Sequence, residues 1–194
     1  MSPLRGGGVV VAALLLVGCA HHITITPPLS TLTAADTTRI DKAVAYYIAP
    51  ADRAREVTTP GGGGDKVTYL PYAQSEPALK RVLSNVFTKV MAIPSLDDKR
   101  YLADNAIAYV FVPTLSTDSS SDSAFTWPPT RFTVTLDCRA VDASGALVWQ
   151  QRVTGEGRAE FSEFKHDRGL AGWRAIQDAF QKLQGAISTA SELR

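Results

Sequence analysis

In the segment Arg131-Phe-Thr-Val-Thr-Leu-Asp-Cys-Arg-Ala-Val141, polar and apolar residues alternate from Arg131 to Ala140, and the predicted sheet is built outward from this segment. Phe132, Val134, Leu136 and Cys138 fall on one face, and polar residues fall on the other. Such alternation is typical of an antiparallel strand with one face buried and the other in water. We therefore predict a half-buried strand over residues 131–141.

The residues that follow predict a β-hairpin. Residues 142–145 read Asp-Ala-Ser-Gly, which favours a tight turn, and residues 146–161 predict the partner strand through Leu147, Trp149 and Val153. Gly155 and Gly157 would weaken a flat strand, so we expect a bend or bulge there.

Upstream segments complete a mixed α and β pattern. Apolar residues predict strands at 42–48, 67–72 and 106–112, and Pro113 ends the last or places it at an edge. Residues 58–65 and 116–123 read as loops. Three- and four-residue apolar spacing predicts helices at 75–91 and 170–187, the first capped by Ser75. The order predicts an α+β fold: a three- to five-stranded mixed or antiparallel sheet with two helices packed on one face.

Several short motifs between residues 109 and 184 carry a family likeness. They are Val-Pro-Thr-Leu at 112–115, a Trp-containing loop, Thr-Val-Thr-Leu at 133–136, Gly-x-Leu-Val-Trp at 145–149 and Gly-Glu-Gly at 155–157. This part is similar to small bacterial envelope lipoproteins whose domain is related to the curli secretion lipoprotein and the TolB N-terminal domain. The likeness implies an anticodon-binding-like α/β sandwich and accessory work for an envelope machine. It implies no active-site residues.

The N-terminus resembles a lipoprotein signal. Leu16-Val17-Gly18-Cys19 resembles a bacterial lipobox, after a short region with Arg5 and an apolar run. A spanning helix needs about 20 apolar residues, whereas this run stops at Cys19. The resemblance implies cleavage after Gly18 and lipid on Cys19; the alternative is a signal-anchor helix with an incidental cysteine. Ala20 in place of Asp implies the outer membrane, facing the periplasm.

The predicted organisation has four parts. Residues 1–18 are the signal peptide, 19–41 the lipidated cysteine and a flexible tether, 42–188 one α/β domain, and 189–194 a frayed end. Arg5 is the one charged residue in the signal, so removing it leaves 19 acidic side chains balanced by basic ones. This balance does not indicate a nucleic-acid partner. Cys138, on an apolar face, is predicted to be a buried small hydrophobe.

Two loops are the candidate contact sites for a partner. Gly61, Gly62, Gly63 and Gly64 predict a hairpin tip or an adaptable contact loop. They do not match a phosphate loop, because Asp65 stands where that motif needs Lys. Phe125 and Trp127 precede prolines in a second loop. Trp127 is either exposed for a partner or folded back over the sheet edge, and the sequence leaves both open.

The chain offers little reactive chemistry. His21 and His22 are adjacent, but a metal site needs three or four convergent ligands and His166 is remote, so no metal and no cofactor is predicted. Asp118 and Asp122 resemble the start of a calcium loop, but Pro129 stands where the bidentate Glu is needed.

We predict a non-enzymatic accessory or scaffold that is held to the membrane by lipid. It would bind an envelope protein or associate with itself. One alternative is a carrier of lipid or glycan in an apolar groove between the helices and the sheet. A cell-wall hydrolase using Glu156, Glu160, Glu163 and His166 is a weaker alternative, because carboxylates about four residues apart on a strand lie too far apart for a retaining glycosidase.

Overall fold

The computed structural model describes residues 20–34, 38–123 and 125–194. The predicted signal peptide, its cleavage site at Gly18 and the lipidated Cys19 lie outside this part of the chain. Within the described residues, no helix is both long and apolar enough to cross a membrane.

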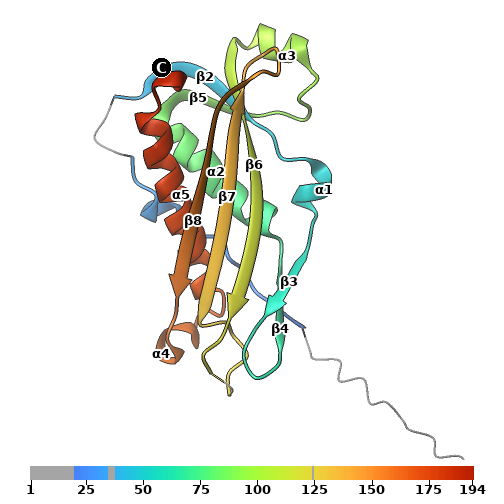
Figure 1. Cartoon of the computed structure of the whole chain (residues 1–194), viewed down its shortest axis with the longest axis vertical. Helices are drawn as coiled ribbons and strands as arrows, with labels where there is room; N and C mark the ends of the chain where they lie inside the picture. Colours follow the sequence, from blue (N-terminus) through green and yellow to red (C-terminus); the bar gives the residue numbers. More distant parts are fainter. Residues whose placement is uncertain (1–19, 35–37, 124) are drawn as a thin grey trace, which may run out of the picture.

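The main sheet has five strands in the order β5-β2-β6-β7-β8. β2 runs parallel to both of its neighbours, and β6, β7 and β8 form an antiparallel meander along the length of the molecule (Figure 1). The predicted α+β class with a mixed sheet is confirmed. The strands are β2 (Ile40–Tyr46), β5 (Phe87–Ala92), β6 (Ile107–Ser120), β7 (Arg131–Val141) and β8 (Leu147–Arg158).

The predicted hairpin is the centre of this sheet. Leu136 of β7 pairs with Val153 of β8, and both strands turn at Gly145, whose φ of 92° favours glycine. The return strand ends at Arg158, short of the predicted residue 161, because Glu160 caps the short helix α4 (Phe161–Phe164). Cys138 is fully buried as predicted, and burial raises the pKa of its thiol to about 12.

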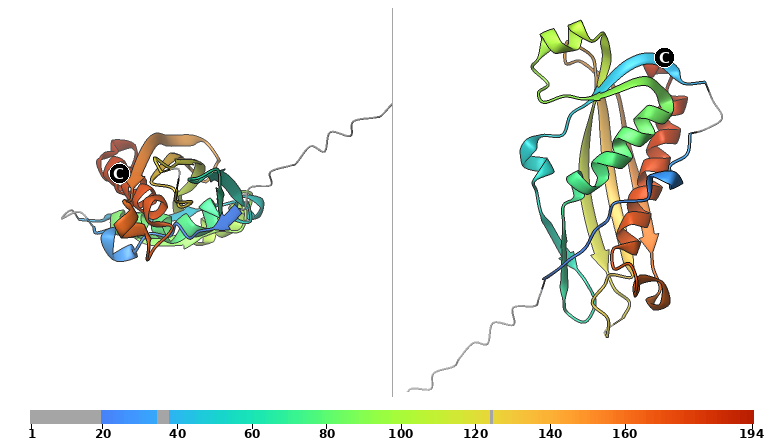
Figure 2. Two further views of the ribbon diagram at one scale, coloured as in Figure 1. Left: turned by 90° about the horizontal axis from the view of Figure 1, so that it is seen from below. Right: turned by 180° about the vertical axis from the view of Figure 1, so that it is seen from behind.

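Two long helices, α2 (Pro71–Val86) and α5 (Leu170–Thr189), cover one face of this sheet, as predicted (Figure 2). α5 lies unusually close to β8. A Cβ added to Gly155 would stand 2.2 Å from the carbonyl oxygen of Ala175. The pairing with β7 is regular at Gly155 and Gly157 and shifts register only between Ala140 and Val141, so of the predicted bend or bulge the bulge is wrong. These glycines admit the helix backbone.

The first long helix lies earlier in the chain than its apolar spacing predicts. α2 ends at Val86, and Phe87–Ala92 forms strand β5 beside β2. Val90 and Met91 fit the helical spacing, yet the extended backbone buries Phe87 completely, with its ring centroid 5.6 Å from that of Phe111. Pro71 opens the helix and Pro77 lies inside it, so the predicted start at Ser75 was late.

Polar segments that the sequence assigned to loops extend the strands. β6 continues through Pro113 to Ser120, because every residue from Val110 pairs with β7. On its other edge β6 pairs with β2, but only as far as Phe111. Pro113 lies beyond the end of that pairing, so this part of β6 is an edge on the β2 side. Two short helices, α1 (Pro50–Arg53) and α3 (Lys99–Asp104), occupy further connections.

A second, three-stranded sheet has the order β1-β4-β3, with β1 parallel to β4. Its strands are β1 (Ala20–His22), β3 (Val57–Pro60) and β4 (Lys66–Tyr69). β4 matches part of the predicted strand at 67–72. β3 takes in residues predicted as loop, and the tip between them holds the four glycines.

The tether prediction is wrong for residues 20–34. After β1, this segment crosses both long helices (Figure 2), and the side chains of Ile25 and Leu32 are buried. The backbone N–H of Ile25 donates to Gln74 Oε1 at 3.0 Å, and the Leu32 carbonyl accepts from Asn85 Nδ2 at 3.0 Å. Side-chain amides of α2 thus satisfy backbone hydrogen-bonding groups of this segment. A short 3-10 helix, Leu29–Thr31, interrupts its extended backbone.

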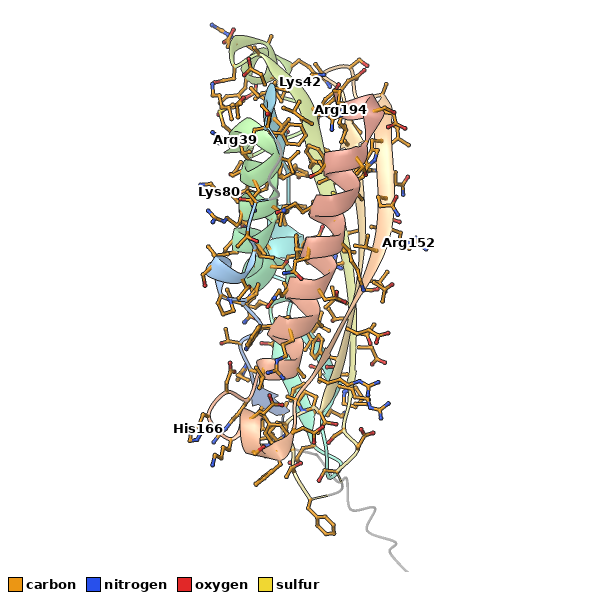
Figure 3. All side chains as sticks on the ribbon, turned by 90° about the vertical axis from the view of Figure 1, so that its left-hand side faces the viewer. Arg39, Lys42, Lys80, Arg152, His166 and Arg194 are labelled. Atoms are coloured by element: carbon orange, nitrogen blue, oxygen red, sulfur yellow. The ribbon has the colours of Figure 1, made fainter. Side chains whose placement is uncertain are left out.

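The C-terminus is likewise ordered, against the prediction of a frayed end. Ser191–Leu193 forms a 3-10 helix, and Leu193 is completely buried. Lys42 Nζ donates to the Arg194 carbonyl at 2.8 Å, which ties the end of the chain to β2 (Figure 3).

Candidate contact surface at the loop end

The two loops singled out by the sequence meet at one end of the molecule, which we call the loop end. It comprises the β3–β4 loop (residues 61–65), the β6–β7 loop (residues 121–130), and α4 with the residues after it (161–168) (Figure 1). The backbone N–H of Gly62 donates to the Trp127 carbonyl at 2.9 Å. Loops that are about 60 residues apart in sequence thus form one surface.

The four glycines differ in what they do. A Cβ on Gly61 would lie 2.3 Å from the Trp127 carbonyl oxygen, so Gly61 allows the two loops to approach. Gly63 and Gly64 have φ values of 65° and 85°, which form the hairpin tip. The hairpin-tip alternative is confirmed, and Gly61 and Gly62 face the neighbouring loop.

Trp127 is folded back and half-buried. The imidazole of His21 stacks on its indole, with ring centroids 4.1 Å apart and an interplanar angle of 15°. Arg168 Cζ lies 5.0 Å from the indole centroid. A partner could not use the face of this ring without displacing His21 or Arg168.

Phe125, by contrast, is 98% exposed, and Phe161 is 62% exposed. Phe161 begins α4 and contacts Phe164 edge to face, with ring centroids 5.7 Å apart. Sequence reasoning missed Phe161 because it extended the strand through this residue. The available signal was Glu160 and Glu163, three residues apart around a helix start, and both form a capping box in the structure.

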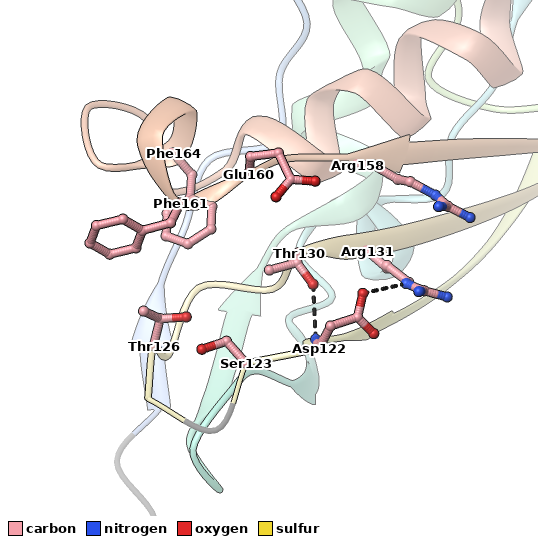
Figure 4. Close-up of a pocket in the computed structure, with 9 residues that line it drawn as sticks. All are labelled: Asp122, Ser123, Thr126, Thr130, Arg131, Arg158, Glu160, Phe161 and Phe164. Atoms are coloured by element: carbon pink, nitrogen blue, oxygen red, sulfur yellow. Dashed lines mark hydrogen bonds and ion pairs between the residues drawn. The ribbon is translucent and has the colours of Figure 1, made fainter.

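Two hollows share Phe161 in their lining. The first, about 290 Å³, lies between the β6–β7 loop and α4 (Figure 4). On its wall Arg131 Nε donates to Asp122 Oδ2 at 2.8 Å, and the Asp122 backbone N–H donates to Thr130 Oγ1 at 3.0 Å. The second, about 230 Å³, is an open groove, which we call the aromatic groove. Its lining comprises Phe125, Thr126, Trp127, Pro128, Phe161, Phe164, Lys165 and Arg168.

Two of the carboxylates proposed for hydrolysis make structural hydrogen bonds at the start of α4. Glu163 accepts from Arg174 Nη2 at 2.9 Å and from the Glu160 backbone N–H at 2.9 Å. These hydrogen bonds, that of Arg174 foremost, lower the pKa of Glu163 to about 2. A carboxylate held ionised in this way is a poor general acid at neutral pH. Glu160 caps α4, while Glu156 lies on the exposed side of β8.

The histidines separate into different roles. His21 Nε2 lies 3.4 Å from Asp65 Oδ2, and His22 Nδ1 lies 2.9 Å from Thr68 Oγ1. His166 is exposed beyond α4 (Figure 3). In the described part of the chain, no three His, Cys, Asp or Glu side chains converge as metal ligands would.

The fold and the loop end thus define an α+β sandwich domain whose first strand begins at a surface of exposed aromatic residues. No family model and no curated protein matches the chain. Among solved structures, it is similar to a Xanthomonas campestris protein of the DUF330 family, with a TM-score of 0.47 and 11% identity over 88% of this chain and 92% of that one. It is also similar to the PelC dodecamer protein from Paraburkholderia phytofirmans, with a TM-score of 0.47 and 14% identity over 80% and 92%.

A candidate lipoprotein from Caulobacter crescentus is a third similar structure, with a TM-score of 0.37 and 20% identity over 75% of this chain and 88% of that one. Likenesses this distant carry no argument about function. The resemblance to the curli secretion lipoprotein and the TolB N-terminal domain stays a prediction.

Proposed function

We propose that the chain is a lipoprotein of the bacterial envelope, anchored through Cys19 in the outer membrane and facing the periplasm. It serves there as a non-enzymatic accessory or scaffold for an assembly or transport machine. The lipobox supports the anchor, and the inert placement of the acidic and histidine side chains supports a role without catalysis.

The observation that carries this proposal is the position of β1. Ala20 immediately follows Cys19 in sequence and pairs with Lys66 of β4. His21, the next residue, stacks on Trp127. Lipid on Cys19 would therefore hold a folded body directly, without a long flexible spacer, and such a body is suited to present a fixed surface to a partner.

Of the predicted contact residues, Phe125, Gly63 and Gly64 are presented outward, whereas Trp127, Gly61 and Gly62 are engaged with neighbouring loops.

The carrier alternative receives less support. It requires space between the helices and the sheet, yet α5 lies so close to β8 that a Cβ on Gly157 would stand 1.9 Å from the Ala171 carbonyl oxygen. The hollows described above open at the loop end instead. Lipid recovered with the purified protein, identified by mass spectrometry, would revive this alternative.

In-cell crosslinking followed by affinity recovery from membranes tests the accessory role. The wild-type chain and a Cys19→Ala variant would be recovered in parallel. We expect one larger envelope protein crosslinked to the anchored form and absent from the Cys19→Ala sample. Recovery of the chain alone in both samples would contradict the accessory role.

A further inference from the structure

The large aromatic side chains that the described residues expose gather at the loop end. Phe125 is 98% exposed and Phe161 is 62% exposed, and both line the aromatic groove. They come from different elements, the β6–β7 loop and α4. Exposed aromatic residues that cluster from separate segments mark a contact surface more strongly than single ones do.

The groove also has a consistent charge. Lys165 and Arg168 line it, and its lining includes no acidic side chain. Two of the acids nearby are paired with arginine, Asp122 with Arg131 at 2.8 Å and Glu163 with Arg174 at 2.9 Å. Two others form hydrogen bonds outside the groove lining: Asp167 accepts from Trp173 Nε1 at 2.7 Å, and Glu160 caps α4. Aromatic rings beside lysine and arginine are the combination that occurs where proteins meet the headgroup region of a bilayer.

The start of the folded chain lies at this same surface. His21 stacks on Trp127, whose ring lines the groove, and Gly169, just after Arg168, lies against the backbone of Thr24. Cys19 directly precedes Ala20, and consecutive Cα atoms are about 3.8 Å apart. A lipid on Cys19 would therefore enter the membrane beside the groove.

We propose that the loop end lies on the phospholipid bilayer itself. Phe125 and Phe161 enter the interfacial layer, and Lys165 and Arg168 pair with lipid phosphates. This inference rests on the lipid anchor proposed above and identifies the contact that Phe125 makes. A bilayer fits better than a protein, because β1 begins at Ala20 and leaves no spacer that could lift the loop end away to admit a protein partner.

Site-directed spin labelling of the full lipidated protein tests the orientation. Phe125→Cys carries the label, and Ala143→Cys, in the exposed β7–β8 turn, is the matched control. Cys138 is completely buried, and Cys19 is blocked by its lipid in the mature form, so neither competes for the label. The protein is reconstituted into vesicles of phosphatidylethanolamine and phosphatidylglycerol. Collisions with oxygen, which enters the bilayer, are compared with collisions with a water-soluble nickel chelate.

We expect the oxygen-to-nickel accessibility ratio at residue 125 to be several-fold higher than at residue 143. Lys165→Glu combined with Arg168→Glu should lower the ratio at 125 towards the control value. Equal ratios at the two sites would overturn the proposal. A label at 125 that is shielded from both reagents would overturn it in favour of a protein contact.

Failure of the anchor is a separate result. If Cys19 carries no lipid, the mass of the N-terminal peptide shows it and the protein does not float with the vesicles. The proposed function and this inference then fall together. A lipidated protein that floats but keeps residue 125 in water leaves the anchor intact and overturns only the membrane contact.

Discussion

The imidazole of His21 stacks on the indole of Trp127, with ring centroids 4.1 Å apart. This contact joins the first described strand to a loop more than 100 residues away in sequence. With Arg168 near the same indole at 5.0 Å, it connects β1, the β6–β7 loop and the segment after α4. The stack therefore orients the start of β1, just after Cys19, relative to the aromatic groove.

Replacing Trp127 with Ala should destabilise the protein by about 1–2 kcal/mol, because a half-buried aromatic pair and its packing are lost. Thermal or urea unfolding measures the change. Phe125→Ala is the matched control: its side chain is almost fully exposed, so we expect a change within about 0.5 kcal/mol. Equal losses in the free energy of unfolding from the two substitutions would contradict a stabilising role for Trp127.

The contact between α5 and β8 gives a second prediction. Gly157→Ala places a Cβ 1.9 Å from the Ala171 carbonyl oxygen, so α5 must move. We expect a loss of more than about 2 kcal/mol in the free energy of unfolding, since overpacking against backbone is poorly relieved. Urea denaturation measures it.

Gly185→Ala serves as the control for that experiment. Gly185 lies in α5, and an added Cβ meets no atom within 4 Å. Alanine should stabilise the helix there by about 0.5–1 kcal/mol. A similar loss at both positions would contradict the close approach of α5 to β8 as the cause of the loss at Gly157.

The ion pair between Arg53 and Glu76 predicts a pH dependence. Arg53 Nε donates to Glu76 Oε2 at 2.8 Å, and Tyr46 Oη donates to Oε1 at 3.1 Å. The Arg53 hydrogen bond lowers the pKa of Glu76 below its ordinary value of 4.5. A depressed carboxyl pKa stabilises the folded state above the unfolded pKa, and the stabilisation is lost as pH falls through the folded value.

Glu76→Gln should therefore cost about 1 kcal/mol at pH 7. The difference from wild type should shrink as the pH falls below 4.5. Chemical unfolding of both proteins across this range isolates Glu76 from other acids. A difference that is unchanged at low pH would show that packing, and not charge, explains the loss.

Side chains of α5 cover the outer edge of β8, and we expect this cover to limit self-association. Asp178 Oδ2 accepts from the Glu156 backbone N–H at 3.0 Å, and Lys182 Nζ donates to the Thr154 carbonyl at 2.8 Å. Side chains of α5 thus occupy edge groups that could pair with another strand. Asp178→Ala with Lys182→Ala should increase concentration-dependent association in sedimentation velocity, whereas Lys80→Ala, an exposed change on α2, should not. No increase would mean that something else protects this edge.

The spacing of apolar residues predicted the strands and helices that bury one regular face. The alternation over 131–141 specified β7, and the apolar spacing over 170–187 specified α5, because each element buries one regular face. The same reasoning failed at Val90 and Met91, whose spacing suits a helix although the free edge of β2 takes them into a strand. It also failed at Ile25, where side-chain amides of a distant helix order a Thr- and Pro-rich segment.

The candidate site was predicted residue by residue but not as a surface. Phe125 and the glycine loop were singled out by composition, yet their meeting depends on long-range pairing of β3, β4 and β6. The role of Trp127 depended on His21 and Arg168, which approach from separate segments. Such contacts leave no periodic signal in the sequence.

Mass spectrometry of the N-terminal peptide shows directly whether the chain carries the proposed lipid anchor. The protein would be extracted from the outer-membrane fraction and digested with trypsin, so that residues 19–39 form the first peptide of the processed chain. The proposed anchor requires that this peptide begin at Cys19, with a diacylglyceryl group on its thiol and an acyl group on its amine. A chain that still begins at Met1, or an unmodified Cys19, would contradict it.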